Sequence, residues 1–241
     1  MSGAGGEIRM SIGFENPSAS RQAPANGVFL ISYMTLRQAV GWIGTLLPIV
    51  LLAGNQIFGS GTLPGSMSAY YYTVMRNVFV AALCVLGVFL ADYAGYGKWD
   101  NLITTVAGCF AIGVALCPTK PSAAVLTTRQ TIIGDLHLFF AAVMFIALAV
   151  MAFRFCKTAP YSRSAPLPRR KRRRNIVYRT CGCSIAACLL LAVILNFAPA
   201  SVKAAVPWLF ILEALAVFAF GASWFVKGQT LLPILKDEPA S

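Results

Sequence analysis

The chain has 241 residues, of which 58% are hydrophobic and only 12% are charged, and its mean hydropathy is +0.71. Soluble domains carry roughly twice that charged fraction, so the composition excludes an ordinary soluble domain and favours a membrane protein. The formal net charge of +12 does not indicate nucleic-acid binding, because nine of the twenty Lys and Arg residues lie between Arg154 and Arg174 rather than across the chain.

Residues 1–27 are rich in Gly, Ser, Ala, Asn and Pro and show no periodicity. We expect a disordered cytoplasmic arm here. It does not resemble a signal peptide, because the first apolar run begins late and no small-residue cleavage pattern follows it closely. We predict a transmembrane domain at residues 28–228 and a cytoplasmic tail at residues 229–241.

Six apolar segments follow the arm, each near the length of about 20 residues that a membrane-spanning helix needs. They are approximately Met34–Ala53, Tyr71–Ala91, Asn101–Cys117, Ile132–Phe153, Ile176–Phe197 and Val206–Val226. Unbroken apolar runs lack the alternation of a transmembrane β-barrel, which leaves helices as the structures that satisfy their own backbone in lipid. The predicted fold is all-α, a polytopic bundle of six transmembrane helices.

The distribution of basic residues predicts the orientation of this bundle. The connection at residues 154–175 is strongly basic, whereas the loop from Asn55 to Ala69 contains no Lys or Arg. Basic loops stay in the cytoplasm, so with six spans both termini are predicted to be cytoplasmic and the protein is a multi-pass protein of the cell membrane. We interpret one basic run as an anchor for anionic lipid head groups, not as a nucleic-acid site: Arg169, Arg170, Lys171, Arg172, Arg173 and Arg174.

Three ionisable residues lie near the predicted outer ends of the second, fourth and sixth segments. Arg76, His137 and Glu213 lie roughly 7–10 Å from the outer ends of their segments at 1.5 Å per residue. Charged groups inside a membrane are costly and are expected to pair with one another or to line a wet cavity. We therefore predict an Arg76–Glu213 ion pair, with His137 and Asp135 nearby.

The second segment also predicts a binding pocket. Ser68, Tyr72 and Arg76 are spaced i, i+4, i+8 and would share one helix face if the helix begins by Ser68. Leu83 and Gly87 continue this face inward as an apolar floor. The shape would suit a lipid or small amphiphile with its polar head at Arg76, and it would equally suit a purely structural ion pair. The candidate ligand-binding residues are Ser68, Tyr72, Arg76, Asp135, His137 and Glu213.

Each candidate also has a structural alternative. Arg76 could anchor its helix by extending to the membrane surface, and Tyr72 could belong to an interfacial aromatic belt. Asp135 could be a favourable charge at a helix N-terminus, and His137 could be a core residue bonded to a backbone carbonyl. Glu213 is the hardest to explain in this way, because it interrupts an apolar run and should have a buried partner.

The residue types allow some chemistry but do not specify it. Ser66 or Ser68, His137 and Glu213 could supply a nucleophile, a base and an orienting carboxylate, yet no G-x-S-x-G turn surrounds either serine. We expect no metal and no cofactor, since the chain has one histidine and its seven cysteines contain no CxxC pair. Three functions stay open: amphiphile binding, a membrane-embedded hydrolase or transferase acting on a lipid-like substrate with His137 as base, and a small transporter. Oligomeric state is not predicted.

Several motifs resemble those of bacterial six-helix integral membrane proteins of unknown function. They are Ser66-x-Ser68-x-Tyr-Tyr-Tyr-Thr-x-x-Arg76-x-x-Phe-Val, Asp92-Tyr-x-Gly-Tyr96 and Ala111-Ile-Gly-Val-Ala-x-x-Pro118-Thr119. The resemblance covers most of residues 35–226. It implies a cell-membrane location and a similar helical bundle, and it assigns no catalytic residue.

Overall fold

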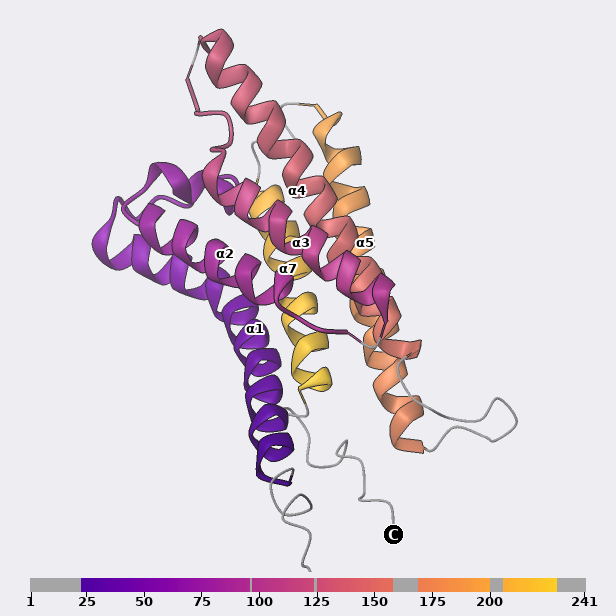
Figure 1. Cartoon of the computed structure of the whole chain (residues 1–241). Helices are drawn as coiled ribbons and strands as arrows, with labels where there is room; N and C mark the ends of the chain where they lie inside the picture. The colour runs from indigo at the N-terminus through magenta and orange to yellow at the C-terminus, as the bar shows by residue number, and fades with distance from the viewer. Residues whose placement is uncertain (1–22, 96, 124, 158–168, 200–205, 229–241) are drawn as a thin grey trace, which may run out of the picture. The chain divides into compact units, whose positions relative to one another are not determined.

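The computed structural model of the chain describes residues 23–95, 97–123, 125–157, 169–199 and 206–228. One compact unit begins at Met34, and the contacts described below lie within it. No strand occurs in the described ranges (Figure 1). The elements in chain order are α1 (Ala23–Phe58), the short 3-10 helix η1 (Ser68–Tyr72), α2 (Arg76–Ala91), α3 (Lys98–Leu116), α4 (Thr128–Arg154), the 3-10 turn η2 (Phe155–Lys157), α5 (Arg169–Asn196) and α7 (Trp208–Lys227).

Five of these helices are long and apolar enough to cross a membrane. They are α1 from Met34 onward, α3, α4 with η2, α5 and α7. The sixth apolar helix, α2, has 16 residues, which is about 24 Å of helix against a hydrocarbon core of about 30 Å. The all-helical class is therefore confirmed, and five helices of spanning length indicate a membrane protein.

The six predicted segments each coincide with a helix, but their ends differ. α1 continues to Phe58 instead of ending at Ala53, and it already begins at Ala23, within the predicted arm of residues 1–27. The predicted basic connection at residues 154–175 is partly helical, because residues 154–157 end α4 and form η2 and residues 169–175 are the first part of α5. Its residues 158–168, residues 1–22 of the predicted arm and the predicted tail at 229–241 lie outside the described residues.

The second predicted segment is interrupted where sequence reasoning expected one continuous helix. Residues 68–72 form η1, and Thr73 then adopts an extended conformation with φ −115° and ψ 177°. The Thr73 hydroxyl donates to the carbonyl of Tyr70 at 2.9 Å and accepts from the amide of Met75 at 3.1 Å. This local side-chain bonding satisfies backbone groups that a continuous helix would otherwise pair. The predicted helix therefore starts only at Arg76.

α7 is the central helix of the bundle. Of its 18-residue apolar window 61% is buried inside the protein, against 28–39% for the other four spanning helices. It packs against α4 and α5, and Gly41 and Gly44 of α1 lie against the rings of Phe225 and Phe220. Small residues allow helices in a membrane to approach closely. The remaining neighbours are α2 with α3, α3 with α4 and α4 with α5.

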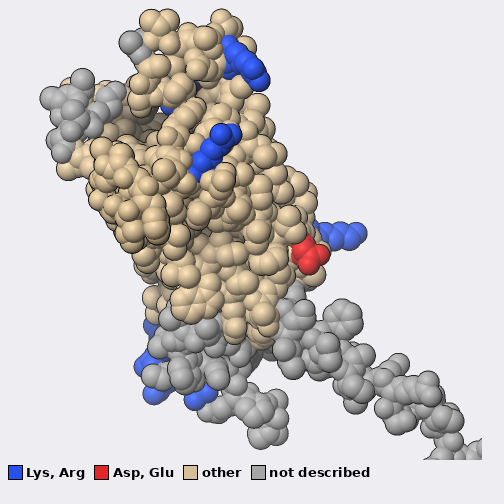
Figure 2. Space-filling model, turned by 90° about the vertical axis from the view of Figure 1, so that its left-hand side faces the viewer, with Lys and Arg blue, Asp and Glu red and all other residues tan. Residues whose placement is uncertain are grey.

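Consecutive helices run in opposite directions, which gives the unit two different ends. At one end the start of α3, the end of α4, the start of α5 and the end of α7 come together, as the Asp100–Arg154 ion pair and the contact of Lys227 with Phe155 show. At the other end the loop after α3 meets α4 through the ion pair of Lys120 with Asp135. Figure 2 shows one face that is mostly uncharged across its middle, with basic side chains in the upper part and in the lower part and one acidic beside one basic side chain at the right-hand edge.

Candidate functional site

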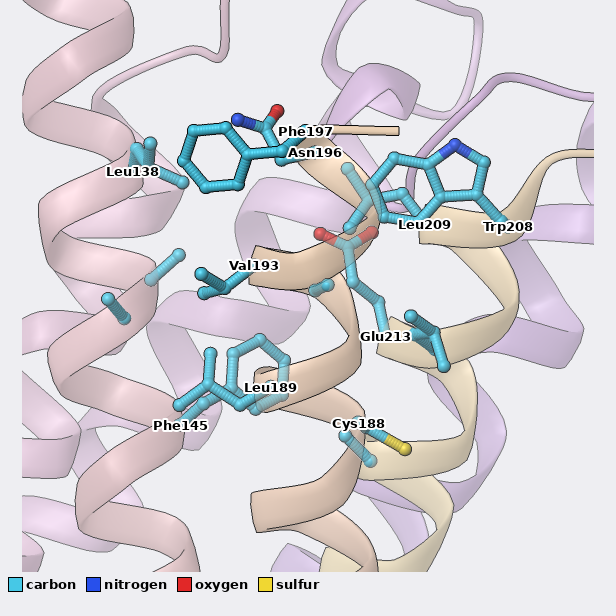
Figure 3. Close-up of a pocket in the computed structure, with 15 residues that line it drawn as sticks. Leu138, Phe145, Cys188, Leu189, Val193, Asn196, Phe197, Trp208, Leu209 and Glu213 are labelled. Carbon is cyan, nitrogen blue, oxygen red and sulfur yellow. The ribbon is translucent and has the colours of Figure 1, made fainter. Parts of the chain in front are cut away.

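A cavity of about 390 Å³ lies between α4, α5 and α7. Its volume falls in the range of about 300–1,000 Å³ that is usual for small-molecule sites. Figure 3 shows Asn196, Phe197 and Trp208 at one end of the cavity and Phe145 and Cys188 at the other. The lining residues are Leu138, Ala141, Ala142, Phe145, Cys188, Leu189, Ala192, Val193, Asn196, Phe197, Trp208, Leu209, Leu212, Glu213 and Ala216.

Among the residues that line this cavity, Glu213 is the one with a carboxylate side chain. It is partly buried, and its Oε2 accepts a hydrogen bond of 2.6 Å from the amide of Met67. In Figure 3 its carboxylate reaches from α7 toward Val193 and Leu209. Within the described part of the chain, the amide of Met67 is the hydrogen-bond donor to Glu213. A carboxylate can accept several hydrogen bonds, and Glu213 accepts one here.

The chain between α1 and η1 holds Glu213 in this position. The amide of Phe210 donates to the carbonyl of Gly65 at 3.1 Å, and the rings of Tyr70 and Phe210 lie 5.9 Å apart. Together with the Met67–Glu213 bond, these contacts tie the loop to the first turns of α7. The predicted buried partner of Glu213 therefore exists, but it is a backbone amide.

A second, smaller cavity of about 40 Å³ adjoins the first. Ser68 lines it together with apolar residues of α1, α2 and α4, and Ala141, Phe145 and Glu213 line both cavities. These three residues form the boundary between the two spaces. Of the predicted site residues, the structure thus brings together Ser68 and Glu213.

The predicted Arg76–Glu213 ion pair is wrong. Arg76 is exposed, donates from Nη2 to the Tyr71 hydroxyl at 2.6 Å and lies over the Tyr71 ring with Cζ 4.2 Å from its centroid. The predicted common face of Ser68, Tyr72 and Arg76 is also absent, because the extended Thr73 separates η1 from α2. Ser68 is buried whereas Tyr72 is half exposed, and the Tyr72 hydroxyl donates to the carbonyl of Thr119 at 2.6 Å.

Two tyrosines of η1, Tyr70 and Tyr72, lie outside the spanning helices and have pKa values raised above the ordinary one. Burial raises the pKa of the Tyr70 phenol. Burial and the neighbouring Tyr71 raise the pKa of Tyr72, and the nearby Arg76 opposes this shift. A raised pKa keeps a phenol neutral, so both side chains act here as hydroxyl groups and not as phenolates.

His137 and Asp135 are held away from both cavities. The ring of His137 is 5% exposed, its Nδ1 lies 2.6 Å from the carbonyl oxygen of Cys117, and it lines neither cavity. Asp135 forms an exposed ion pair of 2.6 Å with Lys120. The predicted combination of Ser68, His137 and Glu213 is therefore not assembled around one cavity, and His137 caps the end of α3. No cluster of three or more potential metal-ligating side chains occurs in the described ranges.

Sequence reasoning missed most of the main cavity. It considered α2 as the wall of the pocket, whereas the walls are α4, α5 and α7. The available signal was the placement of small residues: Ala141 and Ala142 are adjacent on one helix, and Cys188 and Ala192 are spaced i, i+4 on the next. Such a pattern alone is shared with ordinary close packing, so it does not distinguish a cavity from a contact.

Comparison with protein-family models, with curated proteins and with solved structures gives no match.

Proposed function

We propose that this protein is a multi-pass membrane protein that binds a lipid or small amphiphile in the cavity between α4, α5 and α7. The observation that carries the proposal is a space of about 390 Å³ whose lining is apolar apart from a few groups, including the Glu213 carboxylate. Small-molecule sites combine a mostly apolar wall with a small number of polar groups that orient the ligand. An apolar tail along Phe145 and Leu189, with a polar head near Glu213, matches that distribution.

The polar head should donate hydrogen bonds. An ionised carboxylate only accepts, and a protonated one adds a single donor. Because Met67 takes one position on Oε2, the remaining lone pairs suit an amine, hydroxyl or amide. In the hypothesis drawn from the sequence, the polar head of the amphiphile lay at Arg76 instead.

The membrane placement is part of the same proposal. Counting α2 as a short sixth span gives an even number of crossings, and the strongly basic stretch at residues 154–174 then assigns that end of the bundle to the cytoplasm. Both chain termini would be cytoplasmic, in a cell membrane. The cavity, which lies near the start of α7, would open toward the outer half of the bilayer.

Binding should be tested with amphiphiles that share one tail and differ in the head: dodecylamine, dodecanol and dodecanoate. We expect native mass spectrometry of the detergent-solubilised protein to show retention of the amine and the alcohol in preference to the carboxylate. Ala192→Phe should abolish retention because it fills the cavity. Ala186→Phe is the matched control, since Ala186 is exposed on the same helix and does not line the cavity.

Glu213→Gln separates head-group recognition from folding. The amide oxygen of Gln can still accept from Met67, so the fold should persist while the charge is lost. We expect amine retention to fall by roughly tenfold, as for one charge-assisted hydrogen bond. Equal retention of all three amphiphiles by the wild type and by Ala192→Phe would refute the site.

A further inference from the structure

Glu213 borders a second space besides the main cavity. The smaller cavity of about 40 Å³ lies among α1, α2, α3, α4 and α7. Ala141, Phe145 and Glu213 line both spaces, and Glu213 is the polar member of these three. A ligand group that is bound to Glu213 in the main cavity therefore lies next to the smaller cavity.

Ser68 is the second polar side chain of the smaller cavity. The remaining lining residues are Leu, Phe, Val, Ala and Met. Ser68 is only 7% exposed, and its hydroxyl forms no hydrogen bond with any residue that the structure describes. A buried hydroxyl without a hydrogen-bond partner is costly. Its position on the wall of a cavity indicates a partner that enters this space.

The path of the chain places Ser68 beside Glu213. Oε2 of Glu213 accepts a hydrogen bond of 2.6 Å from the amide of Met67, and Ser68 is the next residue. The position of Ser68 is also fixed on its other side, because Tyr70 packs its ring 5.9 Å from that of Phe210 at the start of α7. Ser68 and Glu213 thus form one pair of polar side chains within an apolar wall.

The size of the smaller cavity limits what can occupy it. At about 40 Å³, against about 390 Å³ for the main cavity, it admits a water molecule or one hydroxyl group but not an alkyl chain. A buried water molecule normally has two to four polar partners, and Ser68 and Glu213 are the two polar side chains on this wall. A ligand hydroxyl needs fewer polar partners than water, because the carbon that carries it can lie against the apolar residues.

We propose, building on the amphiphile site proposed above and resting on it, that the ligand head carries two polar groups on neighbouring carbons. One group donates to Glu213 from the main cavity, and the other is a hydroxyl that enters the smaller cavity and bonds to Ser68. A hydroxyl both donates and accepts, so it can pair with the hydroxyl of Ser68. The ligand class is a single-chain amino alcohol or diol, and Ser68 determines the specificity for its second polar group.

The first experiment compares probes that share one tail and differ by one hydroxyl. Wild-type full-length protein in a neutral detergent is titrated with dodecylamine, dodecanol, 2-aminododecan-1-ol and dodecane-1,2-diol, and retention is measured by native mass spectrometry. We expect the amino alcohol and the diol to bind about three- to tenfold more tightly than the amine and the alcohol, as for one added hydrogen bond. The alcohol and the diol are both uncharged, so a difference between them does not depend on amine basicity.

Ser68→Ala tests the location of the second polar group. The variant removes only the hydroxyl oxygen and adds no volume, so it should fold. We expect it to reduce the ratio of diol affinity to alcohol affinity from about three- to tenfold to about one. Ser223→Ala is the matched control, because Ser223 is a buried serine that lines neither cavity. This control should keep the wild-type ratio.

The outcomes separate this proposal from the amphiphile site on which it rests. If the wild type retains dodecylamine or dodecanol but binds the amino alcohol and the diol no more tightly, the amphiphile site stands and the second polar group is refuted. If Ser68→Ala keeps the wild-type ratio, or weakens all four probes equally, Ser68 does not bind the second group and its role is refuted. If the wild type retains none of the four probes, the amphiphile site fails and the specificity proposal fails with it.

Discussion

The contact between α2 and α3 offers the sharpest test of the packing. At Gly87 of α2, an added Cβ would meet the backbone carbonyl oxygen of Gly108 at 2.7 Å and Cγ1 of Ile112 at 2.6 Å. Ordinary van der Waals contact begins near 3.4 Å, so Gly87→Ala would force the helices apart by roughly 0.7 Å. A backbone carbonyl cannot rotate away as a side chain can, so the strain must be taken up by the helices themselves.

The size of the effect follows from two opposing terms. Overpacking costs about 1–3 kcal/mol, whereas replacing a helical Gly by Ala gains up to about 1 kcal/mol from helix propensity. We expect Gly87→Ala to lose a net 1–2 kcal/mol or so. The matched control is Gly44→Ala, which has the same propensity gain but whose Cβ would meet a side chain, the ring of Phe220, at the longer distance of 3.0 Å. Its loss of stability should be clearly smaller than that of Gly87→Ala.

The assay is thermal unfolding of both variants in the same detergent, followed by loss of helical circular dichroism. Gly87→Ala should unfold at a clearly lower temperature than wild type, and Gly44→Ala should be lowered clearly less. If Gly87→Ala were as stable as wild type or as the control, the close approach of α2 and α3 would be refuted.

Three further variants test individual contacts. Asp100→Asn should lower the free energy of unfolding by roughly 2–3 kcal/mol, because it leaves Arg154 without its ionic partner. The control Asp92→Asn, at the exposed end of α2, should leave the unfolding temperature unchanged. Equal effects of the two variants would contradict the buried ion pair. His137→Phe should lower the free energy of unfolding by about 1–3 kcal/mol, because a buried carbonyl at the end of α3 loses its hydrogen bond. The folded variant should still retain amphiphiles in the cavity. Loss of binding without loss of folding would show that His137 takes part in the site. Arg76→Ala should lower the free energy of unfolding by no more than about 1 kcal/mol, the value of an exposed cation–π contact. Amphiphile retention should be unchanged. Loss of retention would instead support the site at Arg76 that the sequence predicts.

The helices could be predicted from the sequence because long apolar runs identify them without any knowledge of their neighbours. The packing role of small residues was equally accessible, and Gly41, Gly44, Gly87 and Gly108 do lie at close helix contacts. The helix boundary at Arg76 was not accessible, because the residues before it carry an i, i+4 spacing that is compatible with a helix. What ends the helix there is local bonding by Thr73, and that competition depends on geometry.

The ion pairs could not be predicted for a different reason. Matched depth suggested that Arg76 would meet Glu213, but depth does not fix which way a side chain points. Asp100 lies just outside the third predicted segment, which begins at Asn101, yet it is buried against Arg154, 54 residues further along the chain. A partner at such separation is determined by which helices pack together, and the apolar pattern of each helix does not specify that choice.

The place of Glu213 on α7 explains why the proposed ligand should carry a donor. The carboxylate lies near the start of the central helix, where the amide of Met67 donates one hydrogen bond to Oε2. The interior of a membrane offers little water to the remaining acceptor positions of a carboxylate. A donor inside the cavity would satisfy them, which is why an amphiphile with a hydrogen-bond-donating head suits this site better than one with an anionic head.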